Sequence, residues 1–412
     1  MTHRVVITGM GTVNPVGQSV AETWESLCAG RSGVGPITLF DASELQVRIA
    51  AEVKNWAPEH FMDPKEARRR DRFQQLAGAA AKEALHQAGL HGQVDDARVA
   101  VVISSAIGGL NTIETGFRTL IEQGPRKISP FYIPMMMSNG AAGLVGIDYG
   151  FRGPTFSVAS ACASGSDAIG LARLLIRNGL ADAAVAGASE ATLTLFGVLP
   201  FDRTGALSRR NEDYSMTPAP FDKNRHGLVM AEGAGIVVLE RLEHAQARRA
   251  PLLAELVGHG ATADAFHITA PAEHGEGGAA AIRLALADAG LAAEEVEYIN
   301  AHGTGTELND LAETEAIKAA LGEAAYRVPV SSTKSMTGHM MGATGALEAI
   351  ICVQAIRTGR IPPTIHYETP DPACDLDYVP NVARAAKVEV ALSNAFGFGG
   401  HNSVLAIRRF AG

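Results

Sequence analysis

The order of apolar and polar positions predicts strands that alternate with helices along the chain. One segment shows this clearly: residues 155–158 form a β-branched and aromatic run, and a helical pattern begins at Ser166 and stops at Asn178-Gly179. Between them lies a cluster of very small residues that carries Cys162. This segment therefore predicts a strand, a tight turn and a buried helix.

The predicted turn places Cys162 where a cysteine can be a nucleophile. Backbone N–H groups without partners and the positive end of a helix dipole favour the thiolate over the thiol. The alternative is a small core residue, because free cysteines are commonly buried and inert. The turn by itself leaves both interpretations open.

The strand and helix pattern occurs twice. The end of a predicted helix at 84–90 matches 285–291 in sequence and spacing, and each is followed by a strand, at 99–103 and 296–300. Three further pairs continue the parallel: 156–158 with 328–330, 183–187 with 388–392, and the opening strand closing on Gly9-Met10-Gly11 with one closing on Gly258-His259-Gly260. The repeat predicts an α/β protein built from two duplicated halves, 1–250 and 251–412, around a pseudo-twofold axis.

Composition narrows the class of protein. The 412 residues are 47% hydrophobic and include 44 glycines, as in a compact globular protein. The spacing of Gly9, Gly11 and Gly17 fits no dinucleotide fingerprint, so we expect these glycines to serve turns. Four cysteines lie far apart with no C-x-x-C pair, which favours a reducing compartment and argues against a disulfide framework.

Charge and hydropathy argue against nucleic acid and membrane as partners. A net charge of −9 argues against nucleic-acid binding, which depends on neutralising phosphates. The first residues pass directly into a strand pattern, and no stretch of about twenty apolar residues lacks charge. We therefore expect a cytoplasmic protein without a signal peptide or a membrane span.

Three loops of the second half follow predicted strands, where functional groups gather in sheets of this kind. His302 lies among glycines after one strand, and His339 lies in a turn of small residues that opens a helix. The stretch 393–402 offers glycine-rich backbone N–H groups. A cysteine with two histidines favours thiol chemistry, with a Cys/His/His zinc site as the weaker alternative.

These motifs together resemble the β-ketoacyl-acyl carrier protein synthases, the condensing enzymes of fatty acid and polyketide synthesis. The resemblance rests on Ser160–Gly165, Asn300–Thr306, Lys334–His339 and Phe396–Gly400, and it extends over nearly the whole chain. It is nearest to the long-chain-elongating type II subtype. It implies a thiolase-like fold of five layers, α-β-α-β-α, and a homodimer.

The resemblance also implies a division of chemical roles. Cys162 would carry the acyl group as a thioester. Malonyl-acyl carrier protein would then lose carbon dioxide, and His302 and His339 would stabilise the resulting enolate. The N–H groups of Cys162 and Phe398 would form the oxyanion hole, and the small neighbours of Cys162 would leave room for the thioester and its oxyanion. Lys334, paired with Glu348, would organise the site.

Substrate contacts follow from the same resemblance. Thr304 and Thr306 match positions that hydrogen-bond the pantetheine arm, although capping of their own loop is an alternative. Phe398 matches a gating phenylalanine, and Ile107 matches a residue of the acyl pocket. The chain has Leu228 where the family commonly has phenylalanine near the nucleophile, so we expect a pocket of altered shape. Phosphopantetheine would arrive on the carrier protein, and we expect no resident cofactor or metal.

An acidic carrier protein needs a basic docking surface on this acidic chain. Residues 65–72 include five lysines and arginines, and Arg126-Lys127 is a possible second patch, although a charge run is usually a solvated helix face. The predicted docking residues are Lys65, Arg68, Arg69, Arg126 and Lys127.

The sequence favours a decarboxylative condensing enzyme of fatty acid elongation. A ketosynthase of a specialised polyketide pathway is the alternative that Leu228 favours. A non-catalytic chain-length subunit characteristically lacks the nucleophile, so Cys162 argues against that role. A thiolase that uses coenzyme A fits the histidine motifs less well.

Overall fold

The computed structural model describes residues 2–412, and its centre is a ten-stranded mixed sheet in the order β10-β9-β13-β14-β8-β1-β7-β6-β4-β5. The strands of the first half are β1 (Val5–Val13), β4 (Val99–Ser104), β5 (Thr155–Phe156), β6 (Ala183–Glu190) and β7 (Gly233–Arg241). Those of the second half are β8 (Ala254–Ala263), β9 (Tyr298–Asn300), β10 (Val330–Ser331), β13 (Val390–Gly397) and β14 (His401–Arg408). Two short ribbons pair β2 (Val34–Pro36) with β3 (Ile49–Ala51) and β11 (Arg360–Ile361) with β12 (Arg384–Ala385).

The strand order confirms the internal repeat. Each half runs from a short parallel edge strand inward, as β5-β4-β6-β7-β1 and as β10-β9-β13-β14-β8. In both halves the first three strands are parallel, the fourth is antiparallel to the third, and the fifth is antiparallel to the fourth. The two halves join through short antiparallel pairing of β1 with β8, which connects Val6 to Glu255 and Ile7 to Ala254. Every strand pair expected from the sequence is therefore an equivalent pair in the structure.

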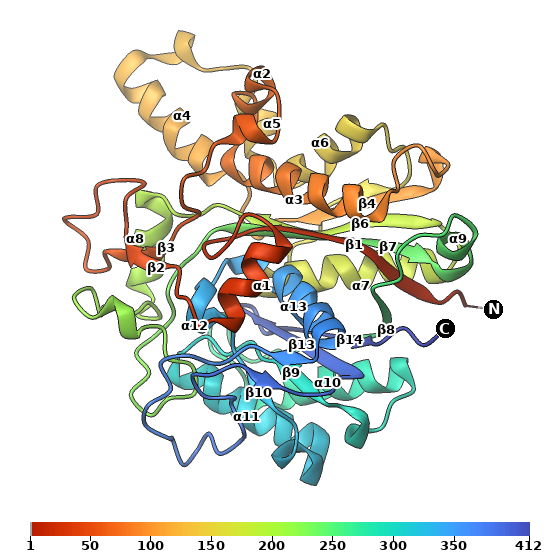
Figure 1. Ribbon diagram of the computed structural model, residues 1–412. Helices are drawn as coiled ribbons and strands as arrows, with labels where there is room; N and C mark the ends of the chain where they lie inside the picture. The colour runs from red at the N-terminus through yellow and green to blue at the C-terminus, as the bar shows by residue number, and fades with distance from the viewer. Residues whose placement is uncertain (1) are drawn as a thin grey trace.

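The helices complete five layers (Figure 1). Helices α3 (Arg72–Ala88) and α6 (Gly140–Tyr149) cover the outer face of the first half, and α10 (Glu276–Ala289) and α11 (Glu307–Leu321) cover that of the second. Helices α7 (Ser164–Arg177) and α13 (Thr344–Thr358) pack against each other between the two half-sheets. Almost every residue of α13 is buried, as expected of a helix that is apolar around its circumference. The predicted α-β-α-β-α fold is confirmed.

The remaining helices lie outside these three helical layers, and all of them except the buried α12 have exposed residues. They are α1 (Val20–Cys28), α2 (Pro64–Ala67), α4 (Leu110–Gln123), α5 (Tyr132–Met136), α8 (Leu195–Arg203), α9 (Leu242–Ala247) and α12 (Lys334–Thr337). Helix α9 lies in the segment between the two halves, and α2, α4 and α5 gather above α3 at the top of Figure 1. No described helix is both long and apolar enough to cross a membrane.

The expectation that Gly9 and Gly11 serve turns is wrong. Both lie inside β1, where an added Cβ would come within 2.1 and 2.0 Å of carbonyl oxygens of α3. Gly258 and Gly260 of β8 stand in the same relation to α10, at 2.2 and 2.1 Å. In each half the missing side chains let a helix lie directly on the strand, which alternation in the sequence does not show.

Candidate active site

Cys162 lies in a short 3-10 turn, Ala161–Ala163, that leads into the N-terminus of α7. Ala161 has a left-handed backbone with φ of 49°, an unfavourable conformation for alanine that sharpens the turn. The turn is braced by Ser164, whose hydroxyl accepts the Ser160 N–H at 3.0 Å and donates to the Ala161 carbonyl at 2.7 Å. The predicted strand, turn and helix are thus present.

Small residues around the turn serve helix packing. A Cβ on Gly165 would lie 2.8 Å from the Gly342 carbonyl oxygen and 2.8 Å from the Ala346 nitrogen. The first turn of α7 therefore touches the start of α13 with no side chain between them. This contact corrects the expectation that room for a thioester accounts for the small neighbours, since at Gly165 the constraint comes from the other half of the fold.

The structure brings His302 and His339 to the sulfur from two loops of the second half. The Nε2 atom of His339 lies 3.1 Å from Cys162 Sγ, and its Nδ1 lies 3.0 Å from the Thr344 hydroxyl. The His302 ring lies almost perpendicular to that of His339, with centroids 5.3 Å apart. Buried Glu313 holds the His302 loop by accepting the N–H groups of His302 at 2.8 Å and of Gly303 at 2.6 Å.

Burial keeps both histidines neutral. It lowers the pKa of His302 and of His339 well below the ordinary value, and the positive charge of Lys334 lowers both further. A neutral imidazole carries one N–H, so each ring can donate one hydrogen bond to an oxygen in the cavity. Such donors, fixed where negative charge develops, are among the strongest catalytic contributions.

The surroundings of Cys162 do not favour the thiolate that the turn predicts. Burial raises the pKa of the Cys162 thiol to about 11, although Lys334 and the Phe398 N–H act in the opposite direction. The resting sulfur therefore carries its proton at neutral pH. Reaction requires a proton acceptor, and His339 Nε2 is within hydrogen-bonding distance.

Lys334 and Glu348 form a buried ion pair behind the histidines. Lys334 opens α12, its side chain is fully buried, and Nζ lies 2.5 Å from a carboxylate oxygen of Glu348 in α13. Burial raises the pKa of Glu348 above the ordinary value, although the adjacent ammonium acts in the opposite direction. Both members of the predicted pair lie together, with the ammonium close enough to act on His302, His339 and Cys162.

Two backbone N–H groups converge on the sulfur from opposite halves. Those of Phe398 and of Cys162 itself lower the pKa of the thiol. A Cβ on Gly397 would lie 3.0 Å from the Cys162 nitrogen, so the glycine turn between β13 and β14 runs directly over the nucleophile turn. The arrangement offers two donors to an oxyanion at this position.

These groups open into a cavity of ≈ 550 Å³. Cys162, His302, His339, Leu228 and Phe398 line it, together with Thr304 and Thr306. The two threonine hydroxyls lie 2.9 Å apart. Exposure rises from buried Thr304 through half-buried Thr306 to exposed Glu307, which places the entrance at this end.

Comparison with known proteins agrees with this geometry. Residues 2–245 match the N-terminal domain of β-ketoacyl synthases, and residues 253–368 match their C-terminal domain. The chain belongs to the β-ketoacyl synthase family. It is 49% identical to a 3-oxoacyl-[acyl-carrier-protein] synthase 2 of Synechocystis sp. over 99% of this chain and 98% of the relative, and 48% identical to one of Staphylococcus aureus with the same coverage.

Solved ketosynthases share the fold of this β-ketoacyl synthase over its whole length. A β-ketoacyl synthase from Burkholderia phymatum is 39% identical, with a TM-score of 0.92 over 99% of this chain and 100% of that one. A ketosynthase in complex with its type II polyketide acyl carrier protein and bound to a hexaketide is 34% identical, with a TM-score of 0.91 and full coverage of both chains.

One predicted pocket residue of the synthase lies elsewhere. Ile107 is 39% exposed and is not among the residues that line the cavity of this chain. Its backbone N–H lies 3.3 Å from a carboxylate oxygen of buried Glu190, which holds the 105–108 loop. The structure of the single chain therefore does not support an acyl contact by Ile107.

The basic run divides between the surface and the interior. The predicted docking residues Lys65, Arg68, Arg69, Arg126 and Lys127 are all exposed. Arg69 lies 4.8 Å from the centroid of the Phe131 ring, which joins the end of α2 to the start of α5. Arg70 and Arg72 instead turn inward, to Asp148 at 2.6 Å and Glu232 at 2.5 Å. Part of the apparent patch therefore serves folding.

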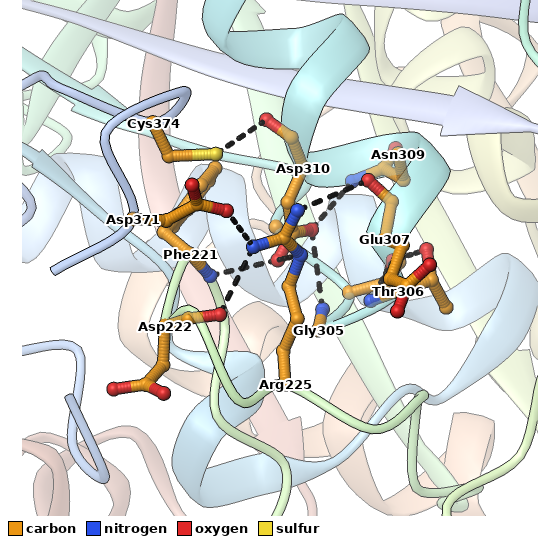
Figure 2. A network of polar contacts seen from close by, with 12 residues as sticks. Phe221, Asp222, Arg225, Gly305, Thr306, Glu307, Asn309, Asp310, Asp371 and Cys374 are labelled. Carbon is orange, nitrogen blue, oxygen red and sulfur yellow. Dashed lines mark hydrogen bonds and ion pairs between the residues drawn. The ribbon is translucent and has the colours of Figure 1, made fainter. Parts of the chain in front are cut away.

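Sequence reasoning missed a buried ionic network next to the loop that carries Thr304 and Thr306 (Figure 2). Arg225 donates to Asp371 at 2.6 Å and to the Asp222 carbonyl at 2.9 Å, and its Nε lies 3.9 Å from Asp310. Asp310 accepts the Gly305 N–H at 3.2 Å, so the network fixes the loop that carries Thr304 and Thr306. Arg225 lies in the same stretch of sequence as Leu228.

Proposed function

We propose that this β-ketoacyl synthase condenses an acyl group with malonyl-acyl carrier protein, with loss of carbon dioxide, in fatty acid elongation. The observation that carries the proposal is Cys162 Sγ at 3.1 Å from His339 Nε2, in a cavity shared with His302 and the Phe398 N–H. The relatives named 3-oxoacyl-[acyl-carrier-protein] synthase 2, at 48–49% identity over 99% of the chain, support the same reaction.

In the first step Cys162 accepts the acyl group. The sulfur attacks the carbonyl carbon of the acyl thioester, and the carbonyl oxygen becomes an oxyanion held by the N–H groups of Cys162 and Phe398. The thiol proton passes through His339 Nε2 to the departing pantetheine sulfur. The products are an acyl-Cys162 thioester and the free thiol of the carrier protein.

In the second step the malonyl thioester binds next to His302 and His339. Its carboxylate leaves as carbon dioxide, and the electron pair of the broken bond forms an enolate. The enolate oxygen accepts hydrogen bonds from neutral His302 and from neutral His339 in the tautomer that carries its proton on Nε2, with the Thr344 hydroxyl donating to Nδ1. The enolate carbon attacks the acyl carbonyl, the carbon–sulfur bond to Cys162 breaks, and the departing thiolate takes up one proton from solvent. Burial keeps the histidines neutral, and Lys334 adds to this effect by its charge but takes no part in proton transfer.

Substrates enter on a carrier protein and not as free cofactors. The hydroxyls of Thr304 and Thr306 line the entrance and would hydrogen-bond the amides of the pantetheine arm, so the protein needs no resident cofactor. The exposed cations of 65–69 and Arg126-Lys127 supply the positive surface for an acidic carrier protein. The complex of a related ketosynthase with its acyl carrier protein supports such a partnership.

A homodimer is part of the proposal. Strand β5 ends the sheet with an unpaired edge, and helices α4 and α5 expose large apolar side chains. Phe117 and Ile121 of α4 are 63% and 81% exposed, and Ile133 of α5 is 62% exposed. A second copy that covered these side chains and extended the sheet would remove both features from water. Sedimentation equilibrium should give twice the chain mass.

A polyketide ketosynthase is the second candidate. Leu228, which is buried and lines the cavity, is smaller than the phenylalanine common in the family, and a solved relative is described as bound to a hexaketide. Intact-mass analysis of products from a panel of acyl carrier proteins distinguishes the two functions. Condensation on saturated acyl primers of increasing length supports fatty acid elongation, whereas repeated condensation without intervening reduction supports the polyketide role.

The decisive experiment separates the two half-reactions. Cys162→Ala should abolish acyl-enzyme formation seen by intact mass, and His302→Ala should acylate but fail to decarboxylate malonyl-acyl carrier protein. Cys28→Ala, which replaces a cysteine of α1, serves as the control and should retain both steps. Acylation of Cys162→Ala, or full condensation by His302→Ala, would contradict the assignment.

A further inference from the structure

A polar cluster lies on the side of the Cys162 turn away from the cavity. Asp167, in the first turn of α7, accepts a hydrogen bond from the Ser160 hydroxyl through one oxygen. Its other oxygen lies 3.3 Å from Nε2 of His259, and that nitrogen lies 3.1 Å from the Ser403 hydroxyl. His259 belongs to β8 and Ser403 to β14, so the cluster joins the two halves of the fold.

The surroundings hold the His259 ring in place. A Cβ on Gly170 would lie 2.4 Å from Nδ1 of His259, so only glycine at this position of α7 leaves space for the ring. The His259 N–H donates to Asp288 at 3.1 Å, and Asp288 is itself paired with Arg173 at 2.6 Å and Arg177 at 2.5 Å. The imidazole is therefore held by packing and by its backbone.

Asp167 is ionised in this cluster. Burial opposes ionisation, but hydrogen bonds from His259 and Ser160 hold the pKa of its carboxyl below the ordinary value. An ionised carboxylate makes hydrogen bonds roughly twice as strong as a neutral acceptor does. The hydrogen bonds of Asp167 with Ser160 and with His259 are therefore both charge-assisted, and the one with His259 links α7 to the second half.

The cluster connects the two predicted oxyanion donors. Ser160 lies two residues before Cys162, and its carbonyl accepts the Ala163 N–H at 3.0 Å, so it forms one end of the strained turn. Ser403 lies on β14, directly after the glycine turn that carries Phe398. The left-handed conformation of Ala161 is unfavourable for alanine and needs such external restraint to persist.

We propose that Asp167 is a positioning residue which, with His259 and Ser403, aligns the Cys162 N–H with the Phe398 N–H across the junction of the two halves. The inference rests on the proposed function, because it presumes an oxyanion at these donors. Asp167 contacts neither substrate nor the reacting atoms. It acts through Ser160 on one side and through β14 on the other.

The test measures single-turnover acylation of Cys162 by acyl carrier protein in the full-length enzyme. Asp167→Asn should lower the acylation rate roughly tenfold, less than the hundredfold or more expected on loss of an oxyanion donor, with the KM for the carrier protein unchanged. Alkylation of Cys162 by iodoacetamide, which forms no oxyanion, should change less than about twofold. Asp167→Asn/His259→Gln should lose no more than the larger single loss, because both residues act through one cluster.

Asp182→Asn is the matched control, since it removes the same charge from an aspartate paired with Arg98 at 3.0 Å, outside the cluster. Three outcomes would overturn the inference: acylation at the wild-type rate in Asp167→Asn, a parallel fall in alkylation, or an acylation loss equalled by Asp182→Asn. In each of these cases the wild type still acylates. Failure of the wild type to acylate would instead contradict the proposed function itself.

Discussion

Replacement of Lys334 by methionine tests whether the buried ammonium organises the site by its charge. The side chain is fully buried and bonds Glu348 at 2.5 Å, and the second oxygen of that carboxylate has no partner. Breaking a buried pair by removing one member costs about 3–5 kcal/mol. At about 2.1 cal/mol/K per residue, the 412 residues have an unfolding entropy near 0.9 kcal/mol/K, so Tm should fall by about 3–6 °C.

The same substitution should move the pH dependence of decarboxylation. Burial and then Lys334 lower the pKa of both histidines, so removing the ammonium raises the pKa of each. A protonated histidine appears at higher pH in the variant, and the neutral pair needed for the enolate is lost earlier as pH falls. The acid limb of the rate of malonyl decarboxylation should therefore shift to higher pH in Lys334→Met.

A double variant separates the two effects. Lys334→Met/Glu348→Met replaces the pair by apolar side chains and should recover most of the lost Tm, because no buried charge is left without a partner. It should keep the shifted acid limb, because the ammonium is still absent. Differential scanning calorimetry and a stopped-flow assay of carbon dioxide release measure the two quantities. An unchanged acid limb in both variants would refute the electrostatic role of Lys334.

Three further predictions concern the nucleophile, docking and the pocket. Because burial raises the pKa of Cys162 to about 11, its alkylation rate should still climb about tenfold per pH unit between pH 8 and 10, and a plateau below pH 9 would contradict this. Arg68→Glu/Arg69→Glu should raise the KM for acyl carrier protein at least about fivefold with kcat unchanged, whereas Arg31→Glu, at another exposed site, should not. Leu228→Phe should narrow the cavity and slow bulky acyl primers more than straight ones; equal rates would exclude Leu228 as a determinant.

Much of the architecture could be predicted because it depends on local patterns of apolar and polar residues. Strand and helix periodicity shows which segments form elements, and the repeat shows that each half orders them alike, as the equivalent strands β4 and β9 confirm. The nucleophile and both histidines follow from their places at strand ends. The fold joins these ends in one cavity because equivalent strands of the two halves end around the pseudo-twofold axis.

What the sequence by itself determined is the set of elements, their duplication and the residues able to perform thiol chemistry. Only the tertiary structure decided what those residues experience. The thiol of Cys162 is harder to ionise than the turn predicts, Arg70 and Arg72 leave the basic surface, and Ile107 lies outside the cavity. The physical reason is common to all three. The burial and pairing of a side chain depend on segments distant in sequence, and local sequence patterns do not show which of these segments pack against each other.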